Sequence, residues 1–91
     1  MTPLERHYAA IARLGCICCR NMGLGFVQAE LHHPYGRKGE NERKVIPTCF
    51  SHHRSGVRNV MFVSRHPWKR EWIKRYGTEE VLLKQVEELM K

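Results

Sequence analysis

Two pairs of potential zinc ligands constrain this chain more than any other feature of its sequence. Cys16 and Cys19 enclose two residues, and Cys49 and His52 repeat that spacing about thirty residues later. A structural zinc ion takes four sulfur or nitrogen ligands, commonly as two such closely spaced pairs. A chain of 91 residues buries only about 60–65% of its unfolded surface, so a bound metal is a common source of extra stability. We therefore expect Cys16, Cys19, Cys49 and His52 to hold one structural zinc ion.

The four cysteines could instead form two disulfides. The segment that begins with Thr2 and Pro3 is typical of a helix start, without the apolar stretch of a secretory signal peptide. No apolar run approaches the ~20 residues of a membrane span. We therefore expect a cytoplasmic protein, where this cysteine spacing favours metal over disulfides. Cys18 is expected to be buried outside the ligand set, unless it replaces Cys19 there.

The length of 91 residues indicates one domain, and the hydrophobic periodicity predicts both helices and strands in it, so we expect an α+β fold over residues 1–91. The inner face of the helix near Pro67 is expected to carry Trp68, Trp72, Ile73 and Tyr76. The expected elements are a helix over 3–14, strands over 26–33 and 44–47, a short helix from Thr48 to about Ser55, a helix capped by Ser64 that stops before Gly77, and a final helix capped by Thr78.

Positive charge is concentrated in the middle of the chain. The net charge is +7, and residues 34–76 hold eleven Lys and Arg against three Glu. A basic block beside a histidine cluster favours a phosphate backbone as partner. Lys44, Arg54, Arg58 and Lys69 are the residues expected to bind nucleic acid. Because the chain has no aspartate, a magnesium site built from clustered carboxylates is not expected.

More histidines lie near the zinc pairs than one zinc ion can use, namely His32, His33, His53 and His66. The strings are Leu14-Gly-Cys-Ile-Cys-Cys19, Leu31-His-His33, Pro47-Thr-Cys-Phe-Ser-His-His-Arg-Ser-Gly56 and His66. In this order they resemble the HNH (His-Me finger) endonucleases with a flanking zinc knuckle. They are most similar to the phage recombination-enhancement-function (Ref) type, over residues 14–77.

This resemblance implies a small zinc-stapled ββα-metal core, flanked by an N-terminal helix and two C-terminal helices. It implies that His33 is the general base and that His32 and His53 bind a catalytic divalent ion, which could be Mg²⁺, Mn²⁺ or Zn²⁺. His66 is expected to be a further ligand or a phosphate contact. Lys44 stands where the HNH motif has its asparagine, which ordinarily orients the loop that bears the base.

The function implied is a metal-dependent DNA endonuclease that leaves 5′-phosphate and 3′-hydroxyl ends. The Ref type acts with the RecA filament, which implies a role in recombination in a bacterial host and a phage or prophage origin. The alternative is a non-catalytic zinc-finger-like module that binds DNA or a recombination protein. That module would need the basic block and the zinc pairs but not His33. A dithiol redox protein is disfavoured, because the cysteine pair lacks a βαβ context.

Overall fold

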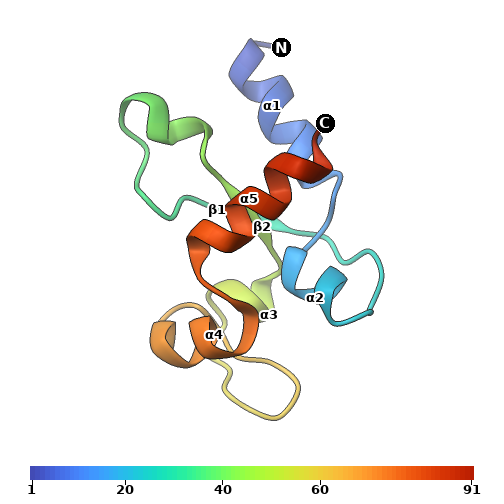
Figure 1. The fold of residues 1–91 in the computed structure, drawn as a ribbon, viewed down its shortest axis with the longest axis vertical. Coiled ribbons are helices and arrows are strands. Elements are labelled where there is room, and N and C mark those ends of the chain that lie inside the picture. The colour runs from blue at the N-terminus through green and yellow to red at the C-terminus, as the bar shows by residue number, and fades with distance from the viewer.

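The computed structural model describes residues 1–91 and has the expected α+β architecture, with five α-helices, one 3₁₀ helix and a two-stranded sheet. The sheet lies at the centre, and α5 crosses it while α1 rises above it (Figure 1). In chain order the elements are α1 (Pro3–Ala12), α2 (Ile17–Asn21), β1 (Glu30–His32), η1 (Gly39–Arg43), β2 (Ile46–Thr48), α3 (Phe50–His53), α4 (Lys69–Tyr76) and α5 (Glu79–Leu89).

The N-terminal helix begins as the sequence predicts. The Thr2 hydroxyl accepts from the Glu5 amide at 3.1 Å, and the Glu5 carboxylate accepts from the Thr2 amide at 2.9 Å, so the capping box is complete. The helix ends at Ala12 rather than 14. The turn into α2 uses Gly15 at φ 75°, where an added Cβ would lie 2.8 Å from the Phe26 ring.

The sheet is shorter than predicted. Only Glu30, Leu31 and His32 pair, with Thr48, Pro47 and Ile46 respectively, in antiparallel register. The expected strand over 26–33 is therefore wrong for 26–29 and for 33, and the second strand covers 46–48 rather than 44–47. Pro47 has no amide hydrogen to donate, which limits the ladder that β2 can offer.

Two further predictions about the C-terminal half are wrong. Ser64 does not cap a helix, because its hydroxyl donates to the His66 carbonyl at 2.6 Å and α4 begins only at Lys69. Trp68 does not face inward: it is 37% exposed, and its indole NH donates to the Gly56 carbonyl. The cap at Thr78 is confirmed, since its hydroxyl accepts from the Val81 amide.

The core contains thirteen buried residues, of which four are the cysteines. The rest come chiefly from α1, the sheet, α4 and α5, and the largest is the fully buried Trp72. None of the helices reaches the length and apolarity that a membrane crossing requires. Because the apolar core is so small, packing around the cysteines contributes a large share of the contacts that stabilise the fold.

Candidate metal centres and catalytic cluster

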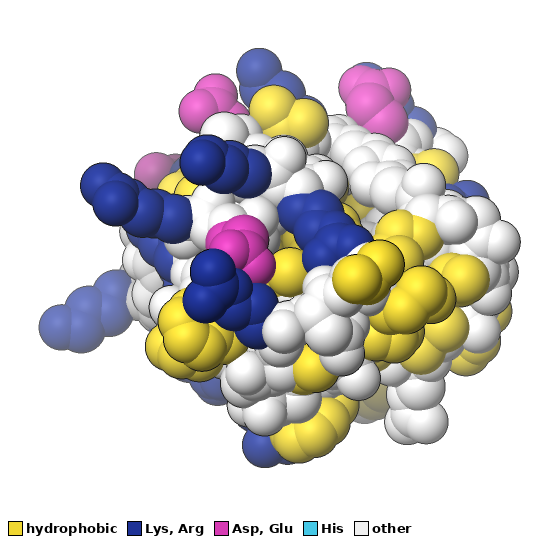
Figure 2. All heavy atoms as spheres, turned by 90° about the horizontal axis from the view of Figure 1, so that it is seen from below, with side chains coloured by type: hydrophobic (Ala, Val, Ile, Leu, Met, Phe, Trp, Pro, Cys, Tyr) yellow, Lys and Arg dark blue, Asp and Glu magenta, His cyan; other side chains and the backbone are white.

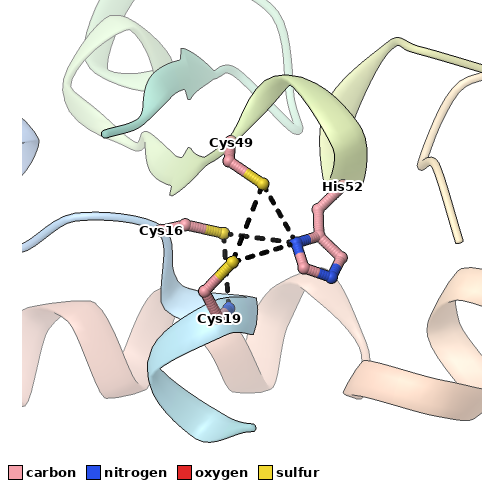
Figure 3. A group of neighbouring side chains, drawn as sticks. All are labelled: Cys16, Cys19, Cys49 and His52. Carbon is pink, nitrogen blue, oxygen red and sulfur yellow. Dashed lines mark hydrogen bonds between the residues drawn. The ribbon is translucent and has the colours of Figure 1, made fainter. Parts of the chain in front are cut away.

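Cys16, Cys19, Cys49 and His52 meet in one buried cluster (Figure 3). Cys16 precedes α2 and Cys19 lies within it, whereas Cys49 is the N-cap of α3 and His52 lies in its only turn. Thr48, expected at that cap, instead ends β2. Cys18 is buried but stands outside the cluster, as expected.

The spacing of the four donor atoms matches a tetrahedral zinc ion. With Zn–S about 2.3 Å and Zn–N about 2.0–2.1 Å, tetrahedral angles place two sulfurs about 3.8 Å apart and a sulfur about 3.6 Å from the nitrogen. The Sγ atoms of Cys19 and Cys49 are 3.7 Å apart. His52 Nδ1 lies 3.5, 3.5 and 3.2 Å from the Sγ atoms of Cys16, Cys19 and Cys49.

The chemistry of the donors also fits a divalent cation. Burial and the negative charge of Cys16 raise the pKa of Cys19 and of Cys49. The pKa of Cys16 is lowered, chiefly by a hydrogen bond from the Cys18 thiol. Without a cation, therefore, burial and mutual repulsion oppose the formation of several thiolates in this cluster. A bound divalent ion removes the repulsion among thiolates and lets all three cysteines ligate. The cluster is compatible with a structural zinc site.

A second cluster brings together His32, His53 and His66, which we call the histidine trio. Their ring centroids are 5.1, 5.3 and 5.5 Å apart. His32 ends β1 and His53 ends α3, while the amide of His66 donates to the carbonyl of His53 at 2.9 Å. Segments distant in sequence thus place three imidazoles around one point.

The histidine trio has the donors for one metal ion. One nitrogen from each ring lies within 4.8 Å of the others, a range that includes the separation of about 3.4 Å between nitrogens in tetrahedral ligation at about 2.0–2.1 Å. The pKa of His66 is lowered by burial and by the neighbouring charge of Arg65, which favours the neutral imidazole that a metal requires. His66 is the exposed member of the trio, so the cluster opens to solvent there.

Two carboxylates form hydrogen bonds with histidines of the trio. The sequence analysis did not assign either of them to the site. Glu30 accepts from Nδ1 of His53 at 2.9 Å, which leaves His53 Nε2 free as a donor to an ion. Glu79 bonds to Nε2 of His32 and also accepts from the Arg65 guanidinium at 3.2 and 3.3 Å. Carboxylates in this position fix the orientation of metal-binding histidines.

Glu79 is ionised despite its position. Its side chain is only 10% exposed. Burial opposes ionisation, but hydrogen bonds from His32 and Arg65 outweigh it and bring the pKa of Glu79 down to about 2. The pKa of Glu30 is also lowered, chiefly by the hydrogen bonds that it accepts from Arg54. Both carboxylates are therefore charged at neutral pH and draw the histidines toward them.

His33 lies outside the trio, on the other side of the strand end. Its Nε2 is 3.0 Å from the Tyr8 hydroxyl, and its Nδ1 is buried without a hydrogen-bond partner in the protein. Burial and the charge of Arg37 lower the pKa of His33. A neutral imidazole at physiological pH is the form that accepts a proton.

The four residues expected to bind nucleic acid differ in their surroundings. Arg54 is paired with Glu30 at 2.6 Å, and Arg58 with Glu71 at 2.8 Å. Lys44 lies over the Tyr35 ring, and the exposed Lys69 makes no ion pair. In the view from below, several Lys and Arg side chains gather on the left and towards the centre of the face, and a patch of hydrophobic side chains lies on the right (Figure 2). Lys44 and Lys69 thus form no ion pair within the protein, whereas Arg54 and Arg58 each pair with a glutamate.

Comparison with known proteins gives one family. A family model described as recombination enhancement, RecA-dependent nuclease matches residues 2–91. No curated protein matches the sequence.

Proposed function

Because the chain belongs to the family of recombination-enhancement, RecA-dependent nucleases, we propose that it is a metal-dependent DNA endonuclease of the HNH (His-Me finger) type. The family makes it a nuclease that takes part in recombination. The HNH assignment, the residue roles and the dependence on a catalytic metal are the parts that we propose. We treat residues 1–91 as one domain, with the zinc-stapled core at 14–77.

The observation that carries this proposal is the convergence of the histidine trio beside the zinc-type cluster. The order β1, β2, α3 matches the ββα arrangement of the HNH core, with one histidine from the first strand and one from the helix. Adjacent positions on α3 serve the two clusters, His52 the first and His53 the second. A binding module would need only the first.

In this mechanism His32, His53 and His66 would hold the catalytic ion. The chemistry that a divalent ion held there would supply is positive charge near the scissile phosphate and the departing 3′ oxygen. Three imidazoles suit zinc and related transition ions better than Mg²⁺, which prefers oxygen ligands. Glu30 and Glu79 keep His53 and His32 turned toward the ion.

We assign the proton transfer to His33. Its neutral imidazole takes a proton from the attacking water, whose oxygen bonds to phosphorus as the bond between phosphorus and the 3′ oxygen breaks. The leaving 3′ oxygen takes a proton from solvent and becomes the 3′-hydroxyl. Lys44 and Lys69 contact DNA phosphates, and Arg54 and Arg58 join them by exchanging a carboxylate for a phosphate. The substrate proposed is DNA, with a RecA filament as partner.

Cleavage of supercoiled and single-stranded DNA tests the proposal, with Mg²⁺, Mn²⁺ or Zn²⁺ and with or without RecA filaments. His33→Ala should lower the cleavage rate by at least about 100-fold, the smallest loss typical of a missing general base. DNA affinity and zinc content should stay near wild type. His7→Gln is the matched control, because His7 bonds only to the Arg43 carbonyl, and it should cleave normally. Wild-type cleavage by His33→Ala under every condition would remove His33 as the base.

A further inference from the structure

Tyr8 reaches from α1 to the histidine that we propose as the general base. Its hydroxyl lies 2.6 Å from the Glu42 carbonyl oxygen and 3.0 Å from Nε2 of His33. The two rings meet edge to face, with centroids 5.6 Å apart and planes at 88°. The hydroxyl is part-buried, so it bridges these two groups away from most of the solvent.

The Tyr8 hydroxyl can donate its proton to only one of these two groups, the Glu42 carbonyl. A carbonyl oxygen can only accept, so at 2.6 Å the Tyr8 hydroxyl must donate its single proton to Glu42. The bond to His33 then requires Nε2 to be the donor and the tyrosine oxygen the acceptor. A neutral imidazole carries one N–H, so His33 Nδ1 is left with a lone pair. That same Nδ1 atom has no hydrogen-bond partner in the protein.

We infer that Tyr8 is a positioning residue, which holds His33 in the Nε2–H form and keeps the lone pair on Nδ1, the nitrogen left to accept a proton. This inference rests on the proposed role of His33. Without the Tyr8 hydroxyl, the side-chain hydrogen bond that holds the proton on Nε2 is lost, so the tautomer and the orientation of the imidazole are less constrained. The fraction of enzyme with a competent base would fall.

The surrounding residues offer His33 no other side-chain partner of this kind. Lys44, at the position of the HNH asparagine, has its ammonium 5.8 Å from the centroid of the Tyr35 ring. The Glu42 carbonyl belongs to η1, which α1 contacts directly. The N-terminal helix therefore fixes both the base and the loop beside it.

Tyr8→Phe tests the inference because it removes only the hydroxyl. The cleavage rate at saturating DNA should fall by about 10- to 100-fold, the loss usual when a partner that orients a functional histidine is removed. The KM for DNA and the zinc content should not change. The matched control is Tyr35→Phe, which removes another hydroxyl, and it should cleave like wild type. An unchanged rate in Tyr8→Phe would overturn the inference.

The histidine protonation pattern gives a readout independent of cleavage. Long-range ¹H–¹⁵N spectra of ¹⁵N-histidine protein should place the His33 proton on Nε2 in wild type and divide it between the two nitrogens in Tyr8→Phe. The His33→Ala spectrum identifies the signal. A proton on Nδ1 in wild type would overturn the inference, even if Tyr8→Phe proved unstable.

The double variant shows whether Tyr8 acts through His33. Tyr8→Phe added to His33→Ala should cause no further loss of rate, because the group that it orients is already gone. If Tyr8→Phe lowered the cleavage rate of His33→Ala by the same factor as it lowers that of wild type, the inference would be contradicted. If His33→Ala itself cleaved normally, the proposed role of His33 as the base would fail, while the ¹⁵N spectra would still decide whether Tyr8 holds His33.

Discussion

Cys16, Cys19, Cys49 and His52 form what we call the Cys3His cluster. Replacing one of these ligands should abolish the folded domain. Cys49 joins α3 to the cluster, and Cys49→Ser removes a thiolate whose Sγ lies 3.7 Å from Cys19 Sγ and 3.2 Å from His52 Nδ1. A structural zinc ion contributes about 10–16 kcal/mol. The net unfolding free energy of a domain this size is about 5–14 kcal/mol. Zinc ligation is thus as large as the whole stability, so weakening it should leave no cooperative thermal transition.

The measurement is zinc content by elemental analysis together with thermal unfolding by circular dichroism in a reducing buffer. Wild type should hold one tightly bound zinc ion at the Cys3His cluster and unfold cooperatively, and a strong chelator should abolish that transition. Cys49→Ser should lose the zinc and the transition together.

Cys18→Ser is the matched control. Cys18 is fully buried but lies outside the ligand set, so its replacement should cost about 1–3 kcal/mol for a buried hydroxyl. The zinc should remain. If reduced wild-type protein without zinc still unfolded cooperatively at the same temperature, the Cys3His cluster would not be the source of stability that we infer.

Three further outcomes follow from the contacts around the trio and the basic surface. Glu79→Gln should lower the unfolding free energy by up to about 3 kcal/mol, because the pKa of Glu79, about 2, lies below the ordinary 4.5. The stabilisation from the ionised carboxylate is complete above about pH 4.5 and is lost only as the pH falls toward 2. Denaturant unfolding should therefore give a constant difference from wild type between about pH 6 and 8. His53→Ala should lose cleavage activity but recover part of it in excess metal, because the defect is in ion affinity, and a defect that no metal concentration changes would contradict this role. Lys69→Ala should weaken DNA binding modestly and reduce the slope of log affinity against log salt by about 0.9 if Lys69 neutralises one phosphate, as filter binding at several salt concentrations would reveal; an unchanged slope would remove Lys69 from the interface.

The sequence predicted best where the physical rule is local. Helix caps depend on side chains within three residues, and both Thr2 and Thr78 cap as expected. The paired spacing of zinc ligands is likewise local, and the structure brings Cys16, Cys19, Cys49 and His52 together. The α+β class follows from such elements.

Prediction was poorer where tertiary contacts decide. Serine is a common helix cap, but the Ser64 hydroxyl donates to the His66 carbonyl instead. Trp68 lies toward the surface, where its indole NH donates to the Gly56 carbonyl. Glu79 looks like an ordinary acidic residue in the first turn of α5, and nothing local indicates that His32, far away in sequence, lies beside it. Glu30 could have been found, because alternation along a strand places it on the same face as His32.

The two clusters are physically coupled through α3. This helix has only four residues, too few to be stable alone, so its orientation depends on its anchors. Successive helix positions diverge by about 100°, so His52 points toward the three thiols while His53 points toward His32 and His66. The segment carrying His66 is fastened to the same turn, since the amides of Arg65 and His66 donate to the carbonyls of His52 and His53. Binding at the Cys3His cluster should therefore set the geometry of the histidine trio.

Cobalt provides a test of this coupling, because thiolate-bound Co²⁺ has intense charge-transfer absorption and imidazole-bound Co²⁺ does not. Added to zinc-loaded protein, Co²⁺ should bind the trio without thiolate absorption, and His53→Ala should weaken that binding. Added to protein stripped of zinc, the first equivalent should instead give thiolate absorption, because the trio forms only after α3 is anchored. If stripped protein bound Co²⁺ at the trio first, with the affinity of the zinc-loaded form, the trio would be preformed and the two clusters independent.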